Sequence, residues 1–485
     1  MLLWDILNAF LLILISLECF RVLQSCSYKP QRGYFKIFAT VYFATLIVTQ
    51  VLVLIFYYFV AKWSATAVLF VAAFVVTIKK RKCPLKITKR ILRMLIAQFC
   101  ILIALCLLFS GAFCVMALPV VCLLSWLICL PIDSLIANFY LKKAVKKLSK
   151  TDIEVVAITG SYGKTCTKDM LSTLLEGGIA PSGSCNTPLG IANFINKTDL
   201  SPYKFLVLEF GARNKGDIKQ LCDLYKPKYG IITGICEQHL STFKTLDNIV
   251  QTKGELAQSL PSDGFCILNG ADDHLKHIVP SCNCYKFFTN KAFVSNAKST
   301  LNGTFFDVLH DNKTYSVHLP QISSYIVDTF LMSFEMCLAL GQSAKLTTSK
   351  CKDIKQTPHR MQISHNGMFY IVDDAYNANI KGVKSCCCTL EQFDNYKIAL
   401  TQGIVEGGKK QGELNQLCGQ MLGGVFDVVM AVGKFANQIA SGAKCGKAEV
   451  VCAKSLNQAM QQLSRYTKPN CIVLFQNDLP DVVGL

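Results

Sequence analysis

Apolar residues are concentrated in the first third of this chain, and this uneven distribution limits what the chain can fold into. Hydrophobic residues make up 52% of the 485-residue sequence. The excess forms about five apolar segments, near residues 3–24, 38–60, 63–78, 94–110 and 112–130. A helix crosses a bilayer with about 20 apolar residues, and shorter helices are tolerated where the membrane thins. We therefore expect a transmembrane helical domain of about five helices over residues 1–148.

The loops between the apolar segments differ in charge. Lys and Arg are frequent in the first loop, in the third loop and after the last segment, whereas the second loop carries only Lys62 and the fourth carries no charge. Positively charged loops stay on the cytoplasmic side of a membrane. The pattern therefore predicts a multi-pass plasma-membrane protein with its N-terminus outside and everything after about residue 140 in the cytoplasm. The amphipathic stretch after Pro131, Ile132 to Val145, is expected to form an interfacial helix that leads into the soluble part.

Charge and cysteine content argue against two other classes of protein. The formal net charge is +18, but many of the basic residues flank the apolar segments, and the sequence has no Arg-rich arm or aromatic–basic repeat. We therefore expect no nucleic-acid partner. The chain holds 24 cysteines. A disulfide scaffold would be short and rich in loops, so these cysteines are expected to be reduced thiols that serve as small apolar residues.

A phosphate-binding turn is predicted at the start of the soluble part. Residues 153–158 are typical of a buried parallel strand, and a helical pattern follows Thr165. Between them stand Gly160, Ser161, Gly163, Lys164 and Thr165. In such a turn, backbone N–H groups and the helix N-terminus face the anion, the lysine offsets phosphate charge, and the hydroxyl binds Mg²⁺. The turn is shorter than the usual P-loop, because Ile158 stands where the first glycine of that loop belongs.

Three more polar residues are expected beside this turn. A second buried strand, 205–208, ends in Glu209, where ligands bind in open α/β sheets. A third strand, 229–233, is followed by His239, and Lys253 lies on a predicted helix. A carboxylate, an imidazole and a lysine beside a triphosphate indicate metal-assisted phosphoryl transfer.

These motifs, in this order, resemble those of the Mur ligases, especially the type that adds D-alanyl-D-alanine to the UDP-N-acetylmuramoyl tripeptide. The resemblance covers about residues 150–485. It rests on the runs 159–165, 186–190, 209–213, 216–218, 359–361 and 373–379, together with His239 and Lys253. The closing residues 475–481 are similar to the ending of a membrane-fused subgroup of the family.

The resemblance implies an ATP-dependent carbon–nitrogen ligase. In this family, ATP phosphorylates a substrate carboxylate, and an amine attacks the acyl phosphate to give an amide, ADP and phosphate. The implied substrates are a peptidoglycan-type cell-wall precursor, reached at the cytoplasmic face of the bilayer, and an amino acid or dipeptide. The implied cofactors are ATP and Mg²⁺, as two ions, with Lys253 carbamylated.

The resemblance also assigns roles to individual residues. The implied catalytic residues are Lys164, His239, Lys253 and Arg360. The implied nucleotide-binding residues are Gly160, Ser161, Gly163, Lys164, Thr165, Arg360, Asp374 and Asn377. The implied metal ligands are Thr165, Glu209, His239 and Lys253. Arg360 and Asp374 would close over the nucleotide and exclude water that would hydrolyse the acyl phosphate.

The expected architecture is α/β and has three parts. A transmembrane helical domain (1–148) is followed by a central P-loop ATPase-like domain (149–355) and a Rossmann-like C-terminal domain (356–485). Residues 282–320 are expected to form a small antiparallel insertion in the central domain. The membrane helices stand where the family has its UDP-binding domain, so the acceptor is either UDP-linked or lipid-linked.

Several positions depart from the family pattern. Gly234 and Ile380 replace an Asn and a Pro, Ser241 replaces an acid, and residues 324–328 replace a segment that helps to hold adenine. Two alternatives therefore stay open. One is a related ligase of the poly-γ-glutamate or folylpolyglutamate type, and the other is a non-catalytic membrane scaffold that binds nucleotide.

Overall fold

The computed structural model separates the chain into two compact units. They are Met1–Phe139 with Pro480–Leu485, and Tyr140–Leu479. The structure describes residues 12–14, 16–17, 19–24, 26, 28, 85–108, 111–237, 240–288, 294–323, 325–376, 378–405 and 407–477.

The described part of the first unit is helical. It contains α5 (Lys89–Leu108) and the beginning of α6 (Gly111–Leu148). Phe20 and Leu23 pack with Ile91 of α5 and Cys122 of α6 in one apolar cluster. The expected interfacial helix does not begin after Pro131, because α6 runs through this residue as a single helix of 38 residues.

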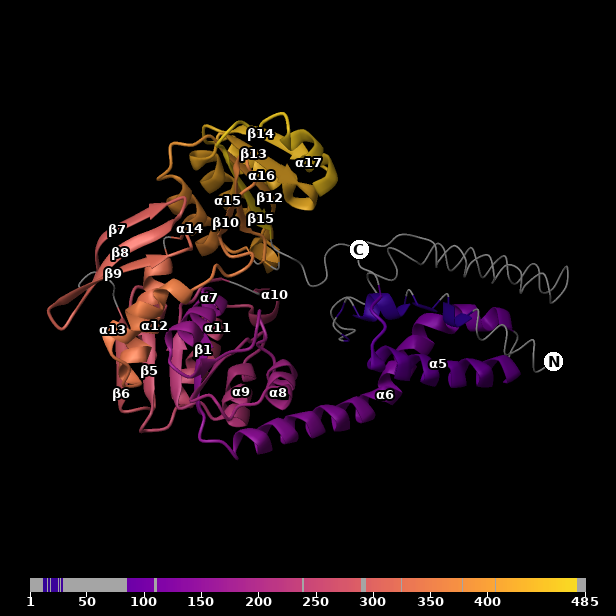
Figure 1. Ribbon diagram of the computed structural model, residues 1–485. Coiled ribbons are helices and arrows are strands. Elements are labelled where there is room, and N and C mark those ends of the chain that lie inside the picture. Colours follow the sequence, from indigo (N-terminus) through magenta and orange to yellow (C-terminus); the bar gives the residue numbers. More distant parts are fainter. Residues whose placement is uncertain are drawn as a thin grey trace. The chain divides into compact units, whose positions relative to one another are not determined.

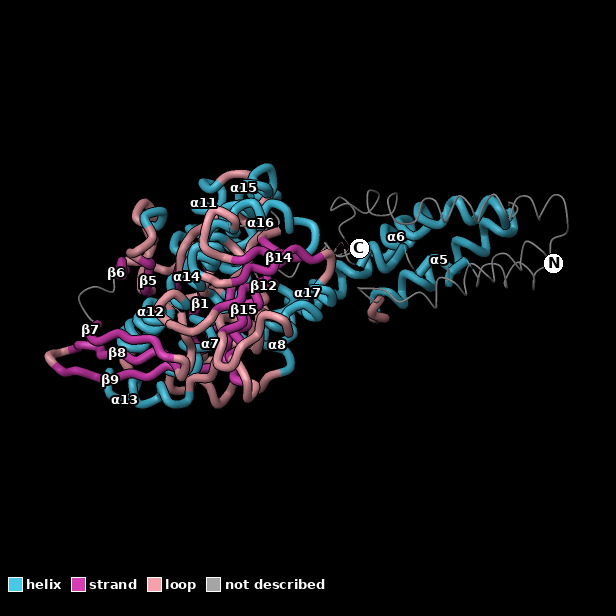
Figure 2. The backbone as a smooth tube through the Cα atoms, turned by 90° about the horizontal axis from the view of Figure 1, so that it is seen from above, coloured by secondary structure: helices cyan, strands magenta, loops and turns pink. Residues whose placement is uncertain are grey.

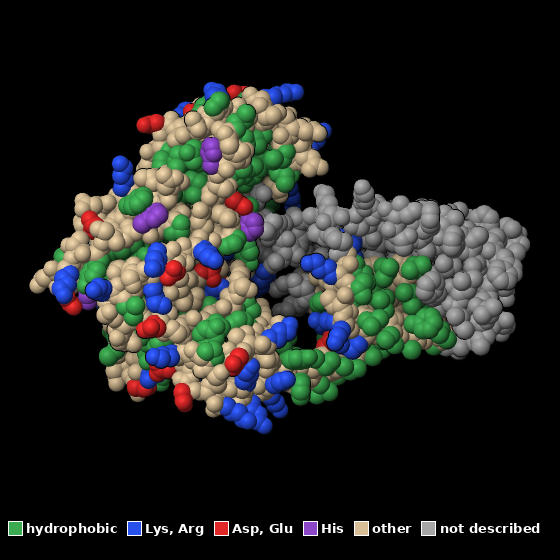
Figure 3. Space-filling model, viewed as in Figure 1, with side chains coloured by type: hydrophobic (Ala, Val, Ile, Leu, Met, Phe, Trp, Pro, Cys, Tyr) green, Lys and Arg blue, Asp and Glu red, His purple; other side chains and the backbone are tan. Residues whose placement is uncertain are grey.

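Much of the surface of α6 is apolar. Leu127, Leu135 and Phe139 are 54%, 70% and 64% exposed, and apolar side chains line the visible face of this helix in Figure 3. Within the described ranges, the stretch Val120–Leu148 is the one helix long and apolar enough to cross a bilayer, a test that core helices also pass. The predicted segments 38–60 and 63–78 lie outside the described residues, as do parts of 3–24 and 94–110.

The second unit begins with a parallel six-stranded sheet in the order β2-β3-β1-β4-β5-β6. Its strands are β1 (Glu154–Thr159), β2 (Gly178–Ile179), β3 (Phe205–Glu209), β4 (Tyr229–Ile232), β5 (Phe265–Asn269) and β6 (Cys284–Phe288). The helices of this region are α7 (Lys164–Leu174), α8 (Pro188–Lys197), α9 (Asp217–Tyr225), α10 (Leu240–Phe243), α11 (Leu246–Gln258), α12 (Ile326–Ala339) and α13 (Ala344–Ser349), with short 3₁₀ turns at Asp273–Leu275 and Lys350–Asp353.

Helices cover both faces of this sheet (Figure 1). Because successive strand residues point to opposite faces, Val155 and Ala157 of β1 pack with α8, α9 and α11, whereas Val156 and Ile158 pack with α7 and α12. Burial on both faces explains why β1 and β3 are continuous apolar runs rather than alternating ones.

The predicted antiparallel insertion is confirmed in part. Strands β7 (Val294–Thr300), β8 (Gly303–His310) and β9 (Lys313–Leu319) form a three-stranded antiparallel sheet, which stands apart from the parallel strands in Figure 2. Phe306 of β8 packs edge-on against Phe330 of α12, with ring centroids 5.3 Å apart. The prediction was wrong for 284–288, because β6 pairs in parallel with β5 at the edge of the main sheet.

A second six-stranded sheet forms the C-terminal part, in the order β10-β11-β15-β12-β13-β14. Only the β10–β11 pair is antiparallel among the described pairs of this sheet. Its strands are β10 (Gln362–His365), β11 (Tyr370–Asp374), β12 (Lys397–Gly403), β13 (Val428–Val432), β14 (Glu449–Ala453) and β15 (Ile472–Asn477). The helices are α14 (Ile380–Leu390), α15 (Gln411–Val425), α16 (Ala436–Ala443) and α17 (Leu456–Leu463), with 3₁₀ turns at Gly408–Lys410 and Gly433–Phe435. The α/β fold predicted for the central and C-terminal parts is therefore confirmed.

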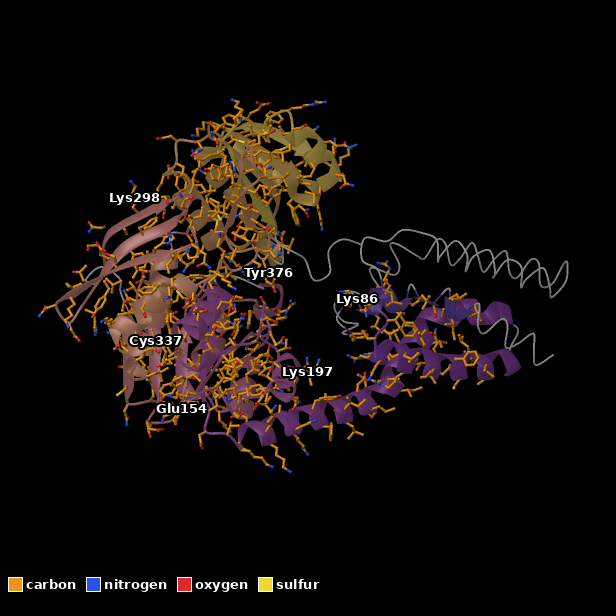
Figure 4. All side chains as sticks on the ribbon, in the orientation of Figure 1. Lys86, Glu154, Lys197, Lys298, Cys337 and Tyr376 are labelled. Carbon is orange, nitrogen blue, oxygen red and sulfur yellow. The ribbon has the colours of Figure 1, made fainter. Side chains whose placement is uncertain are left out.

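The topology brings several polar residues to one edge of the first sheet. Strands β1, β3 and β4 run parallel and side by side, so their carboxyl ends meet. Thr159 and Glu209 are the last residues of β1 and β3. Glu154, labelled in Figure 4, marks the opposite end of β1.

Candidate active site

The glycine turn after β1 has the conformation that its glycines permit. Gly160 and Gly163 have φ values of 148° and 74°, a backbone conformation that residues other than glycine rarely adopt. A Cβ atom on Gly160 would lie 2.1 Å from Thr233 Oγ1. The turn therefore runs tightly against the end of β4, and α7 begins immediately afterwards with Lys164.

Lys164 is held over this turn. Its Nζ donates a hydrogen bond to Gly160 O at 2.8 Å. Burial lowers the pKa of Lys164, the Glu209 carboxylate opposes this shift, and the positive charge of Arg360 adds to it. A half-buried ammonium near a second cation favours an anionic ligand, because the ligand would supply the missing negative charge.

The departure at Gly234 has a steric explanation. Gly234 has a φ of 147°, and a Cβ atom there would lie 2.2 Å from the hydroxyl oxygen of Tyr162. Tyr162 belongs to the glycine turn and therefore fills the space that a side chain at position 234 would need. The Asn of the family pattern does not fit this arrangement of Tyr162.

Glu209 lies at the centre of the polar edge and is only 1% exposed. Its Oε2 accepts a hydrogen bond from Thr165 Oγ1 at 2.8 Å, and its Oε1 accepts one from Asn186 Nδ2 at 3.0 Å. Ser184 Oγ lies 3.5 Å from Thr165 Oγ1. The Glu209 carboxylate and the hydroxyls of Thr165 and Ser184 are oxygen ligands of the kind that Mg²⁺ prefers. These residues therefore fit a magnesium ion.

Lys253 reaches the same region from α11 and is 4% exposed. Burial and the positive charge of Lys164 lower its pKa to about 7, although the negative charge of Glu209 opposes the shift. A large fraction of this amine is therefore neutral at physiological pH. His239 lies outside the described residues. The described residues contain no group of three or more His, Cys, Asp or Glu side chains placed to hold a metal.

The C-terminal part contributes further predicted site residues, which face the glycine turn across a cavity. Arg360 stands between His359 and Met361, which have φ values of 58° and 49°, and its guanidinium carbon lies 4.3 Å from the ring centroid of Tyr376. Figure 4 labels Tyr376, which lies where the C-terminal part meets the first sheet.

Asp374 is the last residue of β11, and its Oδ1 accepts the Met361 N–H at 3.2 Å. Burial raises its pKa, while a hydrogen bond from the Cys386 thiol and the charge of Arg360 act in the opposite direction. Asn377, the remaining predicted nucleotide contact, lies outside the described residues.

The glycine turn and the C-terminal part form two walls of this cavity. It is lined by the glycine turn with Lys164 and Thr165, by part of the segment 321–329, and by Arg360 and Asp374. The structure thus brings together Ser161, Gly163, Lys164 and Thr165 of the glycine turn with Arg360 and Asp374 around one cavity, whereas Gly160 does not line it. Glu209 joins them through its hydrogen bond to Thr165, and Lys253 through its electrostatic interactions with Lys164 and Glu209.

Two polar residues of this region were not predicted as site residues. Asn186 donates a hydrogen bond to Glu209. The run 186–190 was recognised in the sequence as part of the family resemblance, but the contact with Glu209 was not predicted. Lys168 is completely buried, and its Nζ donates to Pro181 O and Gly183 O, both at 2.6 Å. The sequence did hold a signal for this residue. Lys168 stands one helical turn after Thr165, among residues of α7 that are otherwise apolar or small and buried.

Comparison with known proteins identifies the family. The Mur ligase middle domain matches residues 158–337, and the Mur ligase glutamate ligase domain matches residues 359–476. The UDP-N-acetylmuramoyl-tripeptide–D-alanyl-D-alanine ligase of Escherichia coli K12 is 24% identical over 308 residues, which cover 60% of this chain and 67% of that protein. The Haemophilus influenzae protein of the same name is 27% identical over 303 residues, covering 59% and 65%. The chain therefore spans about two thirds of the length of these relatives.

Solved structures show the same fold. The MurF ligase from Thermotoga maritima in complex with ADP superimposes with a TM-score of 0.63 at 23% identity, covering 70% of this chain and 80% of that one. Both domain matches, their order along the chain and the shared fold lead to one conclusion. This chain belongs to the Mur ligases, a family of ATP-dependent carbon–nitrogen ligases.

Proposed function

We propose that this chain joins an amino acid or a dipeptide to the carboxylate of a peptidoglycan-type precursor, through an acyl phosphate and at the expense of ATP. The observation that carries this proposal is the contact between Thr165, at the start of the helix after the glycine turn, and the buried Glu209. It joins a phosphate-binding turn to a magnesium-type carboxylate. D-Alanyl-D-alanine is the amine named by the relatives and is the first candidate here.

In this proposal the glycine turn binds the phosphates of ATP. N–H groups of the turn and the N-terminus of α7 face the anion, and Lys164 offsets charge that develops on the transferred phosphoryl group. Gly160, Ser161 and Gly163 shape the turn. Arg360, Asp374 and Asn377 contact the nucleotide from the C-terminal part.

Thr165, Glu209, His239 and a carbamylated Lys253 would hold two Mg²⁺ ions. When bound, these ions supply positive charge that lets the acceptor carboxylate approach the γ-phosphate. The pKa of about 7 for Lys253 supports the carbamate, because only a neutral amine reacts with carbon dioxide.

The reaction proceeds in two displacements. A carboxylate oxygen of the acceptor attacks the γ-phosphorus, the bond to the bridging oxygen breaks, and ADP leaves. The amine then attacks the acyl carbon, phosphate leaves with the carboxylate oxygen, and the amine nitrogen loses a proton. Arg360 and Asp374, on the wall opposite Lys164, would keep water from the acyl phosphate.

The membrane part of the proposal concerns residues 1–148. We propose that they form a multi-pass anchor in the plasma membrane, followed by a central domain to residue 355 and a C-terminal domain in the cytoplasm. The exposed apolar surface of α6 supports an anchor. Because this segment stands before the central domain, where the family has its UDP-binding domain, a lipid-linked precursor is the second candidate acceptor.

The test is phosphate release by the purified full chain, with Lys164→Ala compared with wild type. Each protein receives ATP, Mg²⁺, a UDP-linked or lipid-linked peptide acceptor, and either D-alanyl-D-alanine or L-glutamate. Lys197→Ala is the matched control, because Lys197 is an exposed lysine of the same domain (Figure 4). We expect the Lys164 variant to lose about 100-fold or more in turnover, as when a main electrostatic contact to the reacting phosphate is removed.

The panel also separates the alternatives. Turnover only with glutamate would favour the poly-γ-glutamate or folylpolyglutamate type. If the wild type binds ATP, but neither it nor Lys164→Ala releases phosphate in response to an acceptor, only the nucleotide-binding scaffold remains.

A further inference from the structure

A buried carboxylate beside the glycine turn, that of Asp272, contacts groups from four other residues. Asp272 follows β5, and its side chain is 2% exposed. Its Oδ2 accepts the Ile235 N–H at 2.7 Å and the Tyr162 hydroxyl at 3.3 Å, and its Oδ1 lies 2.8 Å from His274 Nδ1. The fourth group is Lys381, whose Nζ lies 2.9 Å from Oδ2.

Lys381 connects two parts of the protein. It is the second residue of α14, 109 positions after Asp272. Asn379 caps this helix by accepting the Gly382 N–H at 2.9 Å, and residues 373–379 just before it carry the predicted nucleotide contacts. The ion pair therefore joins the first sheet to the segment of the C-terminal part that lines the cavity.

Tyr162 links the same ion pair to the glycine turn. Lys381 Nζ lies 5.2 Å from the centroid of its ring, within the range of a cation–π interaction. The ring also packs against Tyr325, with centroids 5.4 Å apart. Both tyrosines line the cavity. One carboxylate thus holds the phosphate-binding turn and the C-terminal helix in a single arrangement.

The ion pair between Lys381 and Asp272 is expected to stabilise the contact between the two parts. Burial alone would raise the pKa of Asp272, but hydrogen bonds from Ile235, Lys381 and His274 outweigh burial and lower it, so the carboxylate is ionised at neutral pH. Lys381 is 32% exposed, but its partner Asp272 is buried. Removing the lysine is therefore costly, because it leaves a buried carboxylate without its ammonium partner. A second ion pair across the same boundary, Lys410 with Glu237 at 2.8 Å, is 54% and 33% exposed. Exposed pairs contribute little.

We infer that Lys381 is a positioning residue that fastens the C-terminal part over the nucleotide and, through Asp272, holds Tyr162 and the glycine turn in their binding arrangement. The inference rests on the proposed binding of ATP in this cavity but does not depend on which amide is formed. Loss of the ion pair lowers the fraction of molecules in the arrangement that binds ATP, and apparent affinity falls by the same factor. Saturating ATP restores this arrangement, so kcat changes much less than the KM for ATP.

The experiment measures binding and dissociation of a fluorescent ATP analogue on the full chain. Lys381→Met removes the charge while keeping an unbranched side chain, and Lys381→Arg keeps the charge. Lys384→Met is the control on an exposed face of the same helix, and Lys410→Met removes the exposed ion pair. Asp272→Asn, alone and combined with Lys381→Met, measures the coupling between the two residues.

We expect Lys381→Met to weaken ATP binding about tenfold and to speed its dissociation, because fewer molecules hold the binding arrangement. Lys381→Arg, Lys384→Met and Lys410→Met should stay within about threefold of wild type, since each keeps the charge at Asp272 compensated. In the Asp272→Asn background, Lys381→Met should add little.

Equal affinities for Lys381→Met and Lys384→Met would overturn the inference. So would a loss of thermal stability in Lys381→Met without a change in ATP affinity. A wild-type chain that binds ATP but forms no amide contradicts the proposed ligase activity and leaves this binding test intact. A wild-type chain that binds no ATP contradicts both.

Discussion

At the scale of single residues, Lys253 is a buried lysine whose charge changes with pH near neutrality. Its pKa of about 7 in the folded chain lies well below the ordinary value of 10.5, first because of burial and then because of Lys164. Between these values the unfolded chain binds the extra proton and the folded chain does not. The free energy of unfolding therefore gains a contribution from Lys253 that increases as pH rises from about 7 to 10.5.

The same shift predicts a pH-dependent activity. Because the carbamate forms only on the neutral amine, we expect turnover to rise through pH of about 7 and to increase with added bicarbonate. Lys253→Ala should lose about 100-fold, and a short carboxylic acid such as formate should restore part of the rate by replacing the carbamate oxygens. Initial rates from pH 6 to 9 measure this. A flat profile, or a Lys253→Ala variant with normal turnover, would contradict the proposed role.

At the scale of elements, Lys168 joins α7 to the loop that carries Ser184 and Asn186. Its Nζ donates to two carbonyls of this loop and pairs with Asp169 Oδ1 at 2.9 Å. Lys168→Met keeps the volume but leaves the buried Pro181 carbonyl without its donor, as well as the carbonyl of the exposed Gly183. The loop positions Asn186 on Glu209, so the contact also affects the proposed magnesium site.

We expect Lys168→Met to lower the free energy of unfolding by about 1–3 kcal/mol, as when a buried hydrogen-bond acceptor loses its donor. It should also raise the Mg²⁺ concentration needed for half-maximal turnover. Lys219→Met, at an exposed position of α9, is the control. Urea midpoints and Mg²⁺ titrations provide the measurements. A midpoint equal to that of the control would show that the buried ammonium does not hold the loop.

Local elements of the fold could be predicted, and so could the position of Glu209 beside the glycine turn, whereas the pairing of the more distant Lys381 and Asp272 could not. The sequence of strand, glycine turn and helix at 154–174 was predicted because strand burial, glycine placement and helical spacing are all local signals. The edge strand β6 was misassigned because an alternating apolar pattern does not distinguish a parallel edge from a hairpin. The single helix α6 was missed because Pro131 is usually a boundary. The pair Lys381–Asp272 has no local signal, since 109 positions separate its members.

At the scale of the whole molecule, the loop charges predict the orientation in the membrane. An epitope tag inserted beside Lys62 of the full chain should be cleaved by protease added outside intact cells, because this loop is poor in basic residues. A tag at the C-terminus should be cleaved only after the cells are opened. Protection of the Lys62 tag in intact cells would contradict the predicted arrangement of five spans.

The most direct measurement of acyl phosphate formation follows one oxygen atom. The acceptor, a UDP-linked or lipid-linked tripeptide, carries ¹⁸O in its terminal carboxylate, and the chain receives it with ATP, Mg²⁺ and D-alanyl-D-alanine. If the carboxylate attacks the γ-phosphorus, each released phosphate contains one ¹⁸O from the acceptor, and mass spectrometry of the phosphate detects it. Phosphate released in step with the new amide but without ¹⁸O would contradict the mechanism proposed for this protein.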